Sequence, residues 1–152
     1  IEEVVEDYNG DIWMICGEKI CKLTPKGKVI HYMENEQKAG FATLRKDFDG
    51  DIYAGSLTKG LFKYDKAKKG FIQIKYKNDS ELPIMAIYCD PDGKIYVGTD
   101  GKGMKSVNKN RMNMIDYSID INGVNPNRLK VHTILKDKDG NYWIVFSKKV
   151  SS

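Results

Sequence analysis

The segment Asp47-Phe48-Asp49-Gly50-Asp51-Ile52-Tyr53-Ala54-Gly55 occurs in four related copies along this chain. In every copy an Asp stands three residues before a glycine, an Asp or Asn directly before it, and a Trp or Tyr three residues after it. The four motifs begin at Asp7, Asp47, Asp90 and Asp137, and their glycines are Gly10, Gly50, Gly93 and Gly140. The motif recurs at intervals of about 40 to 47 residues, a period typical of propellers, solenoids and other repeat arrays.

Composition favours a folded, repeat-built chain. Of the 152 residues, 41% are hydrophobic and 11% aromatic, which is enough for a packed core and excludes a disordered chain. The 25 basic and 21 acidic residues are interspersed, so the net charge of +4 does not indicate a nucleic-acid partner. The longest apolar runs, such as Ile12 to Cys16, are too short to cross a bilayer, and we expect no membrane contact by this segment.

The second copy shows the structure expected of one unit. Two short runs, Phe41 to Lys46 and Asp51 to Ser56, flank the Asp-Phe-Asp-Gly turn and predict a β-hairpin, because Asp favours turns and Gly readily adopts positive φ. Leu61 to Tyr64 and Phe71 to Tyr76 predict a third and a fourth strand. No segment shows sustained helical periodicity, so each unit is expected to be four short antiparallel strands.

Four antiparallel strands per period indicate a propeller blade, because leucine-rich and β-helix repeats are shorter. The sequence therefore predicts an all-β, partial β-propeller of about three and a half four-stranded antiparallel blades. The expected blades are residues 1–40, 41–83 and 84–130, with an incomplete blade at 131–152. Both ends fall inside a repeat, so we interpret the sequence as a fragment of a longer protein.

The repeats resemble those of the two-component regulator propeller family. The resemblance is carried by Asp47 to Ser56 followed by Gly60 to Asp65, and by Gly93 to Thr99 followed by Gly103-Met104. In the first and fourth copies, Ile15-Cys16 and Val145-Phe146 replace the Gly-Thr that the family prefers.

In this family such repeats form the periplasmic sensor region of hybrid two-component systems, common in gut Bacteroidetes, which respond to carbohydrate breakdown products. The resemblance implies a non-catalytic sensor or ligand-recognition module of an inner-membrane regulator, whose full-length protein carries a histidine kinase. Its implied partners are a glycan or other small ligand and the remaining propeller blades.

The alternative is a fragment of a propeller enzyme of the lyase or glycosidase type. The chain shows no Ser-His-Asp order, phosphate-binding loop or paired catalytic carboxylates, and His31 and His132 are expected on different strands. We therefore expect no catalytic residue and no cofactor. Two copies of the chain would supply about seven blades, so self-association is a further expectation.

The repeated acidic residues and glycines are expected to be structural. The aspartates would accept hydrogen bonds from backbone N–H groups of the turn, and the glycines would permit its positive φ. A calcium loop of the EF-hand type is excluded, because its twelfth position requires a Glu where the loops from Asp47 and Asp137 have Thr58 and Lys148. No metal site is predicted.

The aromatic residues divide into two groups. Those on the second strand of each unit, expected to pack between blades, are Trp13, Tyr53, Tyr96 and Trp143. Tyr8 and Phe48 lie inside the turns, at an expected rim of the propeller. They are the candidate ligand-binding residues, because a rim aromatic can stack on a sugar ring, although it can equally cover the neighbouring blade.

Two further patterns leave alternatives open. Cys16 and Cys21 are expected on neighbouring strands, where they could form a disulfide or remain reduced. A group of lysines on the outer strands of the second unit could attract an anionic partner or protect an exposed sheet edge. These residues are Lys59, Lys63, Lys66, Lys68, Lys69, Lys75 and Lys77.

Overall fold

The computed structural model describes residues 3–17, 19–33, 40–118, 123, 125 and 128–148. Within these residues the named elements are all β-strands, and no helix is long and apolar enough to span a membrane. The strands form three four-stranded sheets and one two-stranded hairpin, with neighbouring strands antiparallel and in chain order.

The first sheet contains β1 (Val4–Glu6), β2 (Ile12–Cys16), β3 (Lys19–Leu23) and β4 (Val29–Tyr32). The second contains β5 (Phe41–Lys46), β6 (Ile52–Ser56), β7 (Gly60–Asp65) and β8 (Gly70–Ile74). The third contains β9 (Ile84–Cys89), β10 (Ile95–Thr99), β11 (Met104–Asn108) and β12 (Asn113–Tyr117). The hairpin consists of β13 (Leu129–Lys136) and β14 (Tyr142–Lys148).

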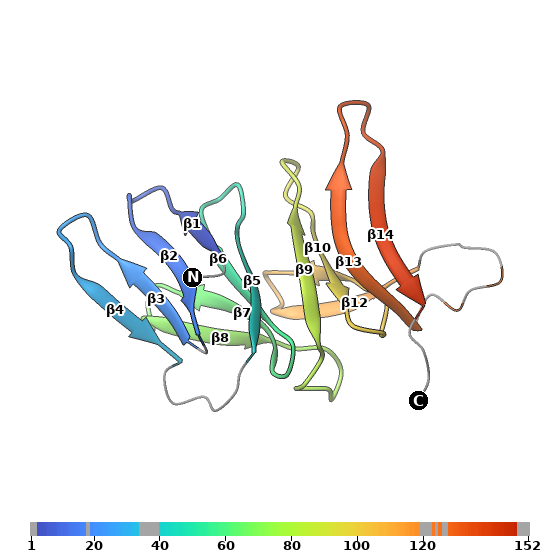
Figure 1. Ribbon diagram of the computed structural model, residues 1–152, viewed down its shortest axis with the longest axis horizontal. Coiled ribbons are helices and arrows are strands. Elements are labelled where there is room, and N and C mark those ends of the chain that lie inside the picture. Colours follow the sequence, from blue (N-terminus) through green and yellow to red (C-terminus); the bar gives the residue numbers. More distant parts are fainter. Residues whose placement is uncertain are drawn as a thin grey trace.

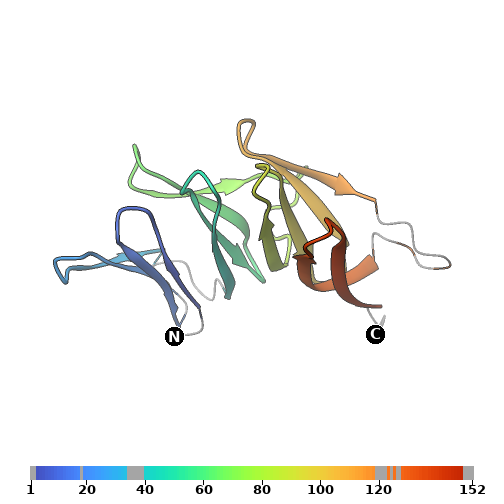
Figure 2. The ribbon, with the colours of Figure 1, turned by 90° about the horizontal axis from the view of Figure 1, so that it is seen from above.

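The sheets stand side by side along an arc, as successive blades do (Figure 2). The first strand of each unit contacts the preceding unit: β5 packs against β1 and β2, β9 against β5 and β6, and β13 against β9 and β10. The turns that carry the repeated motif lie at the same edge of the arc (Figure 1). This arrangement is the all-β partial propeller that the sequence predicts.

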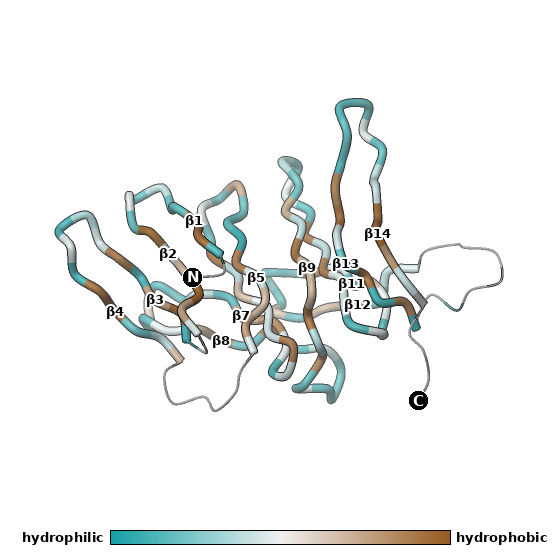
Figure 3. Tube along the Cα trace, viewed as in Figure 1, coloured by the Kyte–Doolittle hydropathy of each residue, from teal (hydrophilic) through white to brown (hydrophobic). Residues whose placement is uncertain are grey.

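The hydrophobic core is divided into three clusters, one at each junction between units. Trp13, Ile15 and Phe41 belong to the cluster between the first two sheets, and the other two clusters fill the next two junctions. Figure 3 shows the corresponding pattern, with hydrophobic segments along the strands and hydrophilic residues at the hairpin tips. Each blade is thus stabilised by burying its faces against its neighbours.

The predicted strands agree with the structure except near some ends. The fourth strand of the second unit was expected to reach Tyr76, but β8 ends at Ile74. The reason is that Lys75 pairs with the third sheet instead: its N–H donates to the Met112 carbonyl at 2.9 Å, and its carbonyl accepts from the Met114 N–H at 2.7 Å. The predicted loose insert at 119–128 falls largely outside the described residues.

In three of the four motifs the Asp side chain joins the turn to the following strand. One carboxylate oxygen of Asp47 accepts the N–H groups of Asp49 at 3.0 Å and Asp51 at 2.9 Å. The other accepts the Tyr53 hydroxyl at 3.0 Å. We call this arrangement the Asp clamp. It satisfies backbone donors at a hairpin tip and attaches the aromatic of the second strand to the same residue.

The first and fourth units use a Trp in the clamp. The indole N–H of Trp13 donates to Asp7 at 2.8 Å, and that of Trp143 donates to Asp137 at the same distance. Asp7 and Asp137 also accept two backbone N–H groups each, from residues two and four positions further along.

The third unit differs, because Asp90 accepts the hydroxyl of Tyr88, at 2.8 Å, and the N–H of Asp92, at 3.1 Å. The sequence pattern alone did not show that the clamp donor could come from the first strand.

The expectation that the second-strand aromatics are packed between blades is correct for Trp13, Tyr53 and Tyr96, which are buried. It is wrong for Trp143, of which 62% is exposed. Its hairpin has only two strands, and no further sheet covers this face within the described part of the chain.

The second strands of the second and third units contain the pairs Gly55-Ser56 and Gly98-Thr99, and the neighbouring blade explains why each pair begins with a glycine. A Cβ on Gly55 would lie 2.6 Å from Cγ2 of Ile84, and one on Gly98 would lie 2.6 Å from Cγ1 and 2.8 Å from the carbonyl oxygen of Val131. Ile84 and Val131 lie on the first strands of the following units, so these glycines permit the close approach of neighbouring blades. The sequence shows the glycines but not the neighbour that requires them.

We predict that Gly98→Ala destabilises the protein by about 1 to 3 kcal/mol, because the added methyl group overlaps Val131. Gly70→Ala is the matched control, since a Cβ there meets nothing closer than the Lys68 carbonyl oxygen at 3.9 Å. Urea unfolding of both variants measures the difference. Equal stability of the two variants would show that blade approach does not depend on Gly98.

A second pair of variants tests the Asp clamp. Asp47→Ala should cost about 2 to 4 kcal/mol, because it leaves a buried tyrosine hydroxyl and two backbone donors without their acceptor. Asp137→Ala removes the same charge from a clamp whose bonds are exposed, where water replaces the carboxylate, so a cost of about 1 kcal/mol or less is expected. Thermal or urea unfolding measures both losses of stability. A larger loss in Asp137→Ala than in Asp47→Ala would contradict the idea that the stabilisation by the clamp depends on its burial.

Candidate functional site

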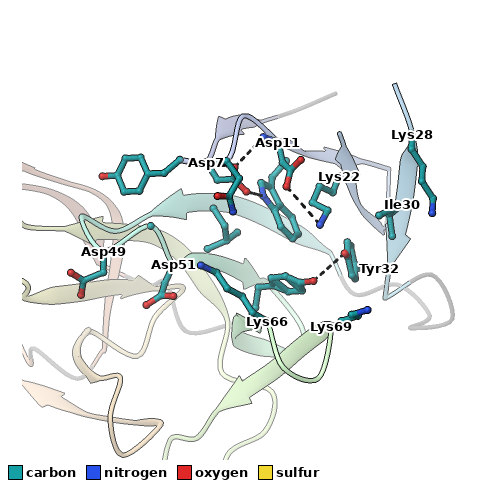
Figure 4. A pocket seen from close by; sticks show the side chains of 16 residues that line it. Asp7, Asp11, Lys22, Lys28, Ile30, Tyr32, Asp49, Asp51, Lys66 and Lys69 are labelled. Carbon is teal, nitrogen blue, oxygen red and sulfur yellow. Dashed lines mark hydrogen bonds and ion pairs between the residues drawn. The ribbon is translucent and has the colours of Figure 1, made fainter. Parts of the chain in front are cut away.

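A cleft of about 490 Å³ opens between the first and second sheets. Its walls are formed by the motif turns of the first two units, by β3 and β4 of the first sheet, and by the β7–β8 turn. Figure 4 shows Asp49 and Asp51 at one end of this cleft, and Lys28, Lys69 and Tyr32 at the other. We call it the inter-blade cleft.

Aromatic side chains form the base of the inter-blade cleft. Trp13 stacks on Tyr32 with ring centroids 5.4 Å apart and packs against Tyr64 at 4.8 Å. The hydroxyl oxygens of Tyr32 and Tyr64 lie 3.3 Å apart, within hydrogen-bonding distance. Burial, together with the hydrogen bond to Tyr32, raises the pKa of Tyr64 to about 12, so this hydroxyl is protonated at neutral pH.

Charged residues of both signs line the same cleft. The ammonium of Lys22 lies 3.8 Å from the Asp11 carboxylate and 5.3 Å from the centroid of Trp13. The Asp7 carboxylate is occupied by its own clamp. Lys28, Lys66 and Lys69 also line the cleft, and no ion pair joins them to another residue in the described part of the chain.

Tyr8 and Phe48 are both exposed at the turns, but they are placed differently. Tyr8 lines the inter-blade cleft and donates its hydroxyl to the Phe48 carbonyl at 3.3 Å. The Lys46 ammonium lies 4.2 Å from the centroid of the Tyr8 ring, and a Cβ on Gly50 would lie only 2.7 Å from Cδ2 of the same ring. Tyr8 therefore covers the neighbouring blade, whereas the Phe48 side chain is not among the residues that line this cleft.

The three aspartates of the second turn gather around one lysine. Lys109, from the β11–β12 turn, places its ammonium 3.1 Å from Asp47 and 2.8 Å from both Asp49 and Asp51. Burial by itself lowers the pKa of Lys109, but its hydrogen bonds to the three carboxylates outweigh this effect and raise the pKa. Oxygen atoms of these carboxylates are close enough together to hold a metal ion, but the ammonium already supplies a cation there.

A second cleft, of about 380 Å³, runs along the first strands of the units. It is lined by Glu3, Arg45, Cys89 and His132, among others. Glu3 forms an ion pair with Arg45, and His132 Nε2 lies 3.0 Å from the Ser147 hydroxyl. Burial, followed by the nearby Asp47 charge, raises the pKa of the Cys89 thiol to about 12, which makes it a poor nucleophile at neutral pH.

No disulfide joins Cys16 and Cys21, because Cys21 pairs across the strands with Met14 and Cys16 with Lys19. His31 does have a partner that the sequence did not indicate, since its Nδ1 lies 3.2 Å from Cys21 Sγ.

The cleft residues Tyr32, Tyr64 and Lys28 were not predicted as site residues. They come from β4, β7 and the residue before β4, and no shared spacing in the sequence links them.

Comparison with known families and structures supports the propeller assignment. Residues 79–101 match the family model described as two component regulator propeller, which includes the third Asp-Gly motif. This match confirms the family resemblance that the repeats predict. No curated protein sequence matches the chain significantly.

Solved structures match over nearly the whole chain. The extracellular domain of BT3049 from B. thetaiotaomicron, described as a hybrid two component system, has a TM-score of 0.74 and 23% identity over 95% of this chain. That of BT4673 from the same organism has a TM-score of 0.73 and 16% identity over 94%. Virginiamycin B lyase from Staphylococcus aureus has a TM-score of 0.72 and 14% identity over 93%.

The chain spans only 19% of the BT3049 chain, 22% of the BT4673 chain and 47% of the lyase. These identities establish the fold alone, because both sensors and lyases share it. The chain is therefore a partial β-propeller that carries a two component regulator propeller repeat.

Proposed function

We propose that this chain is a non-catalytic ligand-recognition module in the periplasmic sensor region of a membrane-bound two-component regulator. The observation that carries this proposal is the match of residues 79–101 to the two component regulator propeller model. The similarity in fold to extracellular domains of hybrid two component systems supports it. The ligand is a carbohydrate fragment, and the regulator's histidine kinase responds to a shift in domain or subunit arrangement.

The inter-blade cleft supports ligand recognition, because it combines aromatic rings with positively and negatively charged side chains. The lyase-like alternative is less well supported. In the cleft along the first strands, Glu3 is paired with Arg45 and the Cys89 thiol is neutral, so neither of these two residues is poised as a general base.

The proposal is tested by calorimetric titration of the full natural chain that carries these residues with a broad panel of oligosaccharides. We expect heat of binding for at least one saccharide and no product by mass spectrometry after prolonged incubation. If no saccharide gives a heat of binding and a ligand of another class binds, the proposal that the ligand is a carbohydrate is wrong. Turnover of a bound saccharide would favour the enzyme alternative.

The hairpin of β13 and β14 presents an apolar face that we propose is covered by a further blade. Leu135, Trp143 and Val145 lie on this face, and each is more than half exposed. Val145 stands at the position where Gly55 and Gly98 meet the next unit, and it is 55% exposed. In the 152-residue chain by itself, a second copy can cover the same face.

Light scattering of the 152-residue chain tests this coverage. We expect the average mass to rise with concentration, and Val145→Asp to suppress the rise by placing a charge on the apolar face. Val29→Asp, at a residue 50% exposed on β4 of the first sheet, is the matched control and should leave the association unchanged. A folded monomer at every concentration would contradict self-association.

A further inference from the structure

The acidic residues of the inter-blade cleft already have partners. Asp49 and Asp51 each hold the Lys109 ammonium at 2.8 Å, and Asp11 is paired with Lys22 at 3.8 Å. The hydrogen bond and positive charge of Lys109 lower the pKa of Asp49, so this carboxylate is ionised at neutral pH and can accept hydrogen bonds. The end of the cleft at Asp49 and Asp51 is therefore rich in acceptors.

The opposite end is positively charged. Lys28 comes from the first sheet and Lys69 from the turn of the second; Figure 4 shows Lys69 beside Tyr32, and Lys28 at the same end of the cleft beyond Ile30. Neither ammonium forms an ion pair with another residue among those that the structure describes. Two like charges from different blades that line one end of a cleft without a carboxylate partner favour an anion there.

Tyrosine hydroxyls add a neutral donor at this end. In the bond between the hydroxyls of Tyr32 and Tyr64 only one proton is shared, so the other hydroxyl proton can be donated to a ligand. The Tyr64 hydroxyl, whose pKa is raised, is protonated at neutral pH. The partly buried rings of Tyr32 and Tyr64 supply an apolar surface for the face of a sugar or another ring.

We propose that the inter-blade cleft binds an acidic saccharide, with its carboxylate or sulfate at Lys28, Lys69 and Tyr32 and its hydroxyl groups directed towards Asp49 and Asp51. Uronate-bearing and sulfated sugars share the chemistry that this end recognises. This proposal rests on the proposed ligand-recognition function, and it narrows the ligand from saccharides in general to anionic ones.

The experiment is calorimetric titration of the full natural chain with uronate-bearing and sulfated disaccharides, with their uncharged parent disaccharides, and with 4-hydroxybenzoate as an anion that is not a sugar. An acidic disaccharide should bind and its neutral parent should bind about tenfold more weakly or not at all, because the neutral parent cannot form charge-assisted hydrogen bonds with the lysines. The affinity should fall as the salt concentration rises from about 0.05 M to about 0.5 M.

Variants assign the binding to this end of the cleft. Lys28→Met and Lys69→Met should each weaken binding of the acidic disaccharide about tenfold. Lys68→Met is the matched control, because Lys68 lies on the same exposed turn but does not line the cleft, and it should change the affinity by less than about twofold. All three side chains are exposed, so thermal unfolding should show unchanged stability.

The outcomes separate the two proposals. If neutral saccharides bind and the variants Lys28→Met and Lys69→Met bind them equally well, the acidic-ligand inference is overturned. The proposal of carbohydrate recognition is then unaffected. Binding of 4-hydroxybenzoate alone, lost in both lysine variants, would support the anion site and overturn the carbohydrate part of both proposals. The absence of binding by every probe would overturn both, as would acidic-saccharide binding that Lys68→Met weakens as much as the other variants.

Discussion

The Asp clamp is the interaction on which the rest of this structure depends. In the second unit a single carboxylate, Asp47, accepts two backbone N–H groups of the turn and the Tyr53 hydroxyl of the following strand. It therefore holds the turn and the start of the second strand together. A slip of one residue in that hairpin would move every side chain to the opposite face of the sheet. By holding this register, the clamp keeps the apolar faces directed at the neighbouring blades.

Neighbouring blades meet closely at their first and second strands and less closely further out. Gly55 and Gly98 let Ile84 and Val131 approach within a distance that a side chain would prevent. Between the first two sheets, the tyrosines and lysines of the outer strands and turns leave a cleft. The same repeat thus produces a tightly packed interior and an open outer site, and the Trp13 side chain belongs to the core while lining that site.

The sequence predicted the fold well because its evidence is local. Strands such as Ile12–Cys16 and Ile95–Thr99 were located correctly, since each follows an Asp-Gly turn at a constant distance. Contacts between units were harder to foresee. Trp143 was expected to be buried but is exposed, and Lys75 was assigned to its own sheet but pairs with the next one. Lys109 stands at the same place in its unit as Lys66 does in the second, but the repeat pattern did not show that it reaches three aspartates of another blade.

The amino-acid sequence was sufficient to establish the turn chemistry, the strand order and the propeller architecture, because these follow from interactions within about ten residues that recur four times. The inter-blade cleft depends on the tertiary structure. Lys28 and Tyr32 of the first sheet share a cleft with Lys69 of the second only when the two sheets pack against each other, and Phe48 does not line this cleft although it lies in an equivalent turn to Tyr8. Lysines and tyrosines outside the motif line the cleft beside motif residues such as Asp49 and Asp51, so periodicity identifies the scaffold but not the cleft.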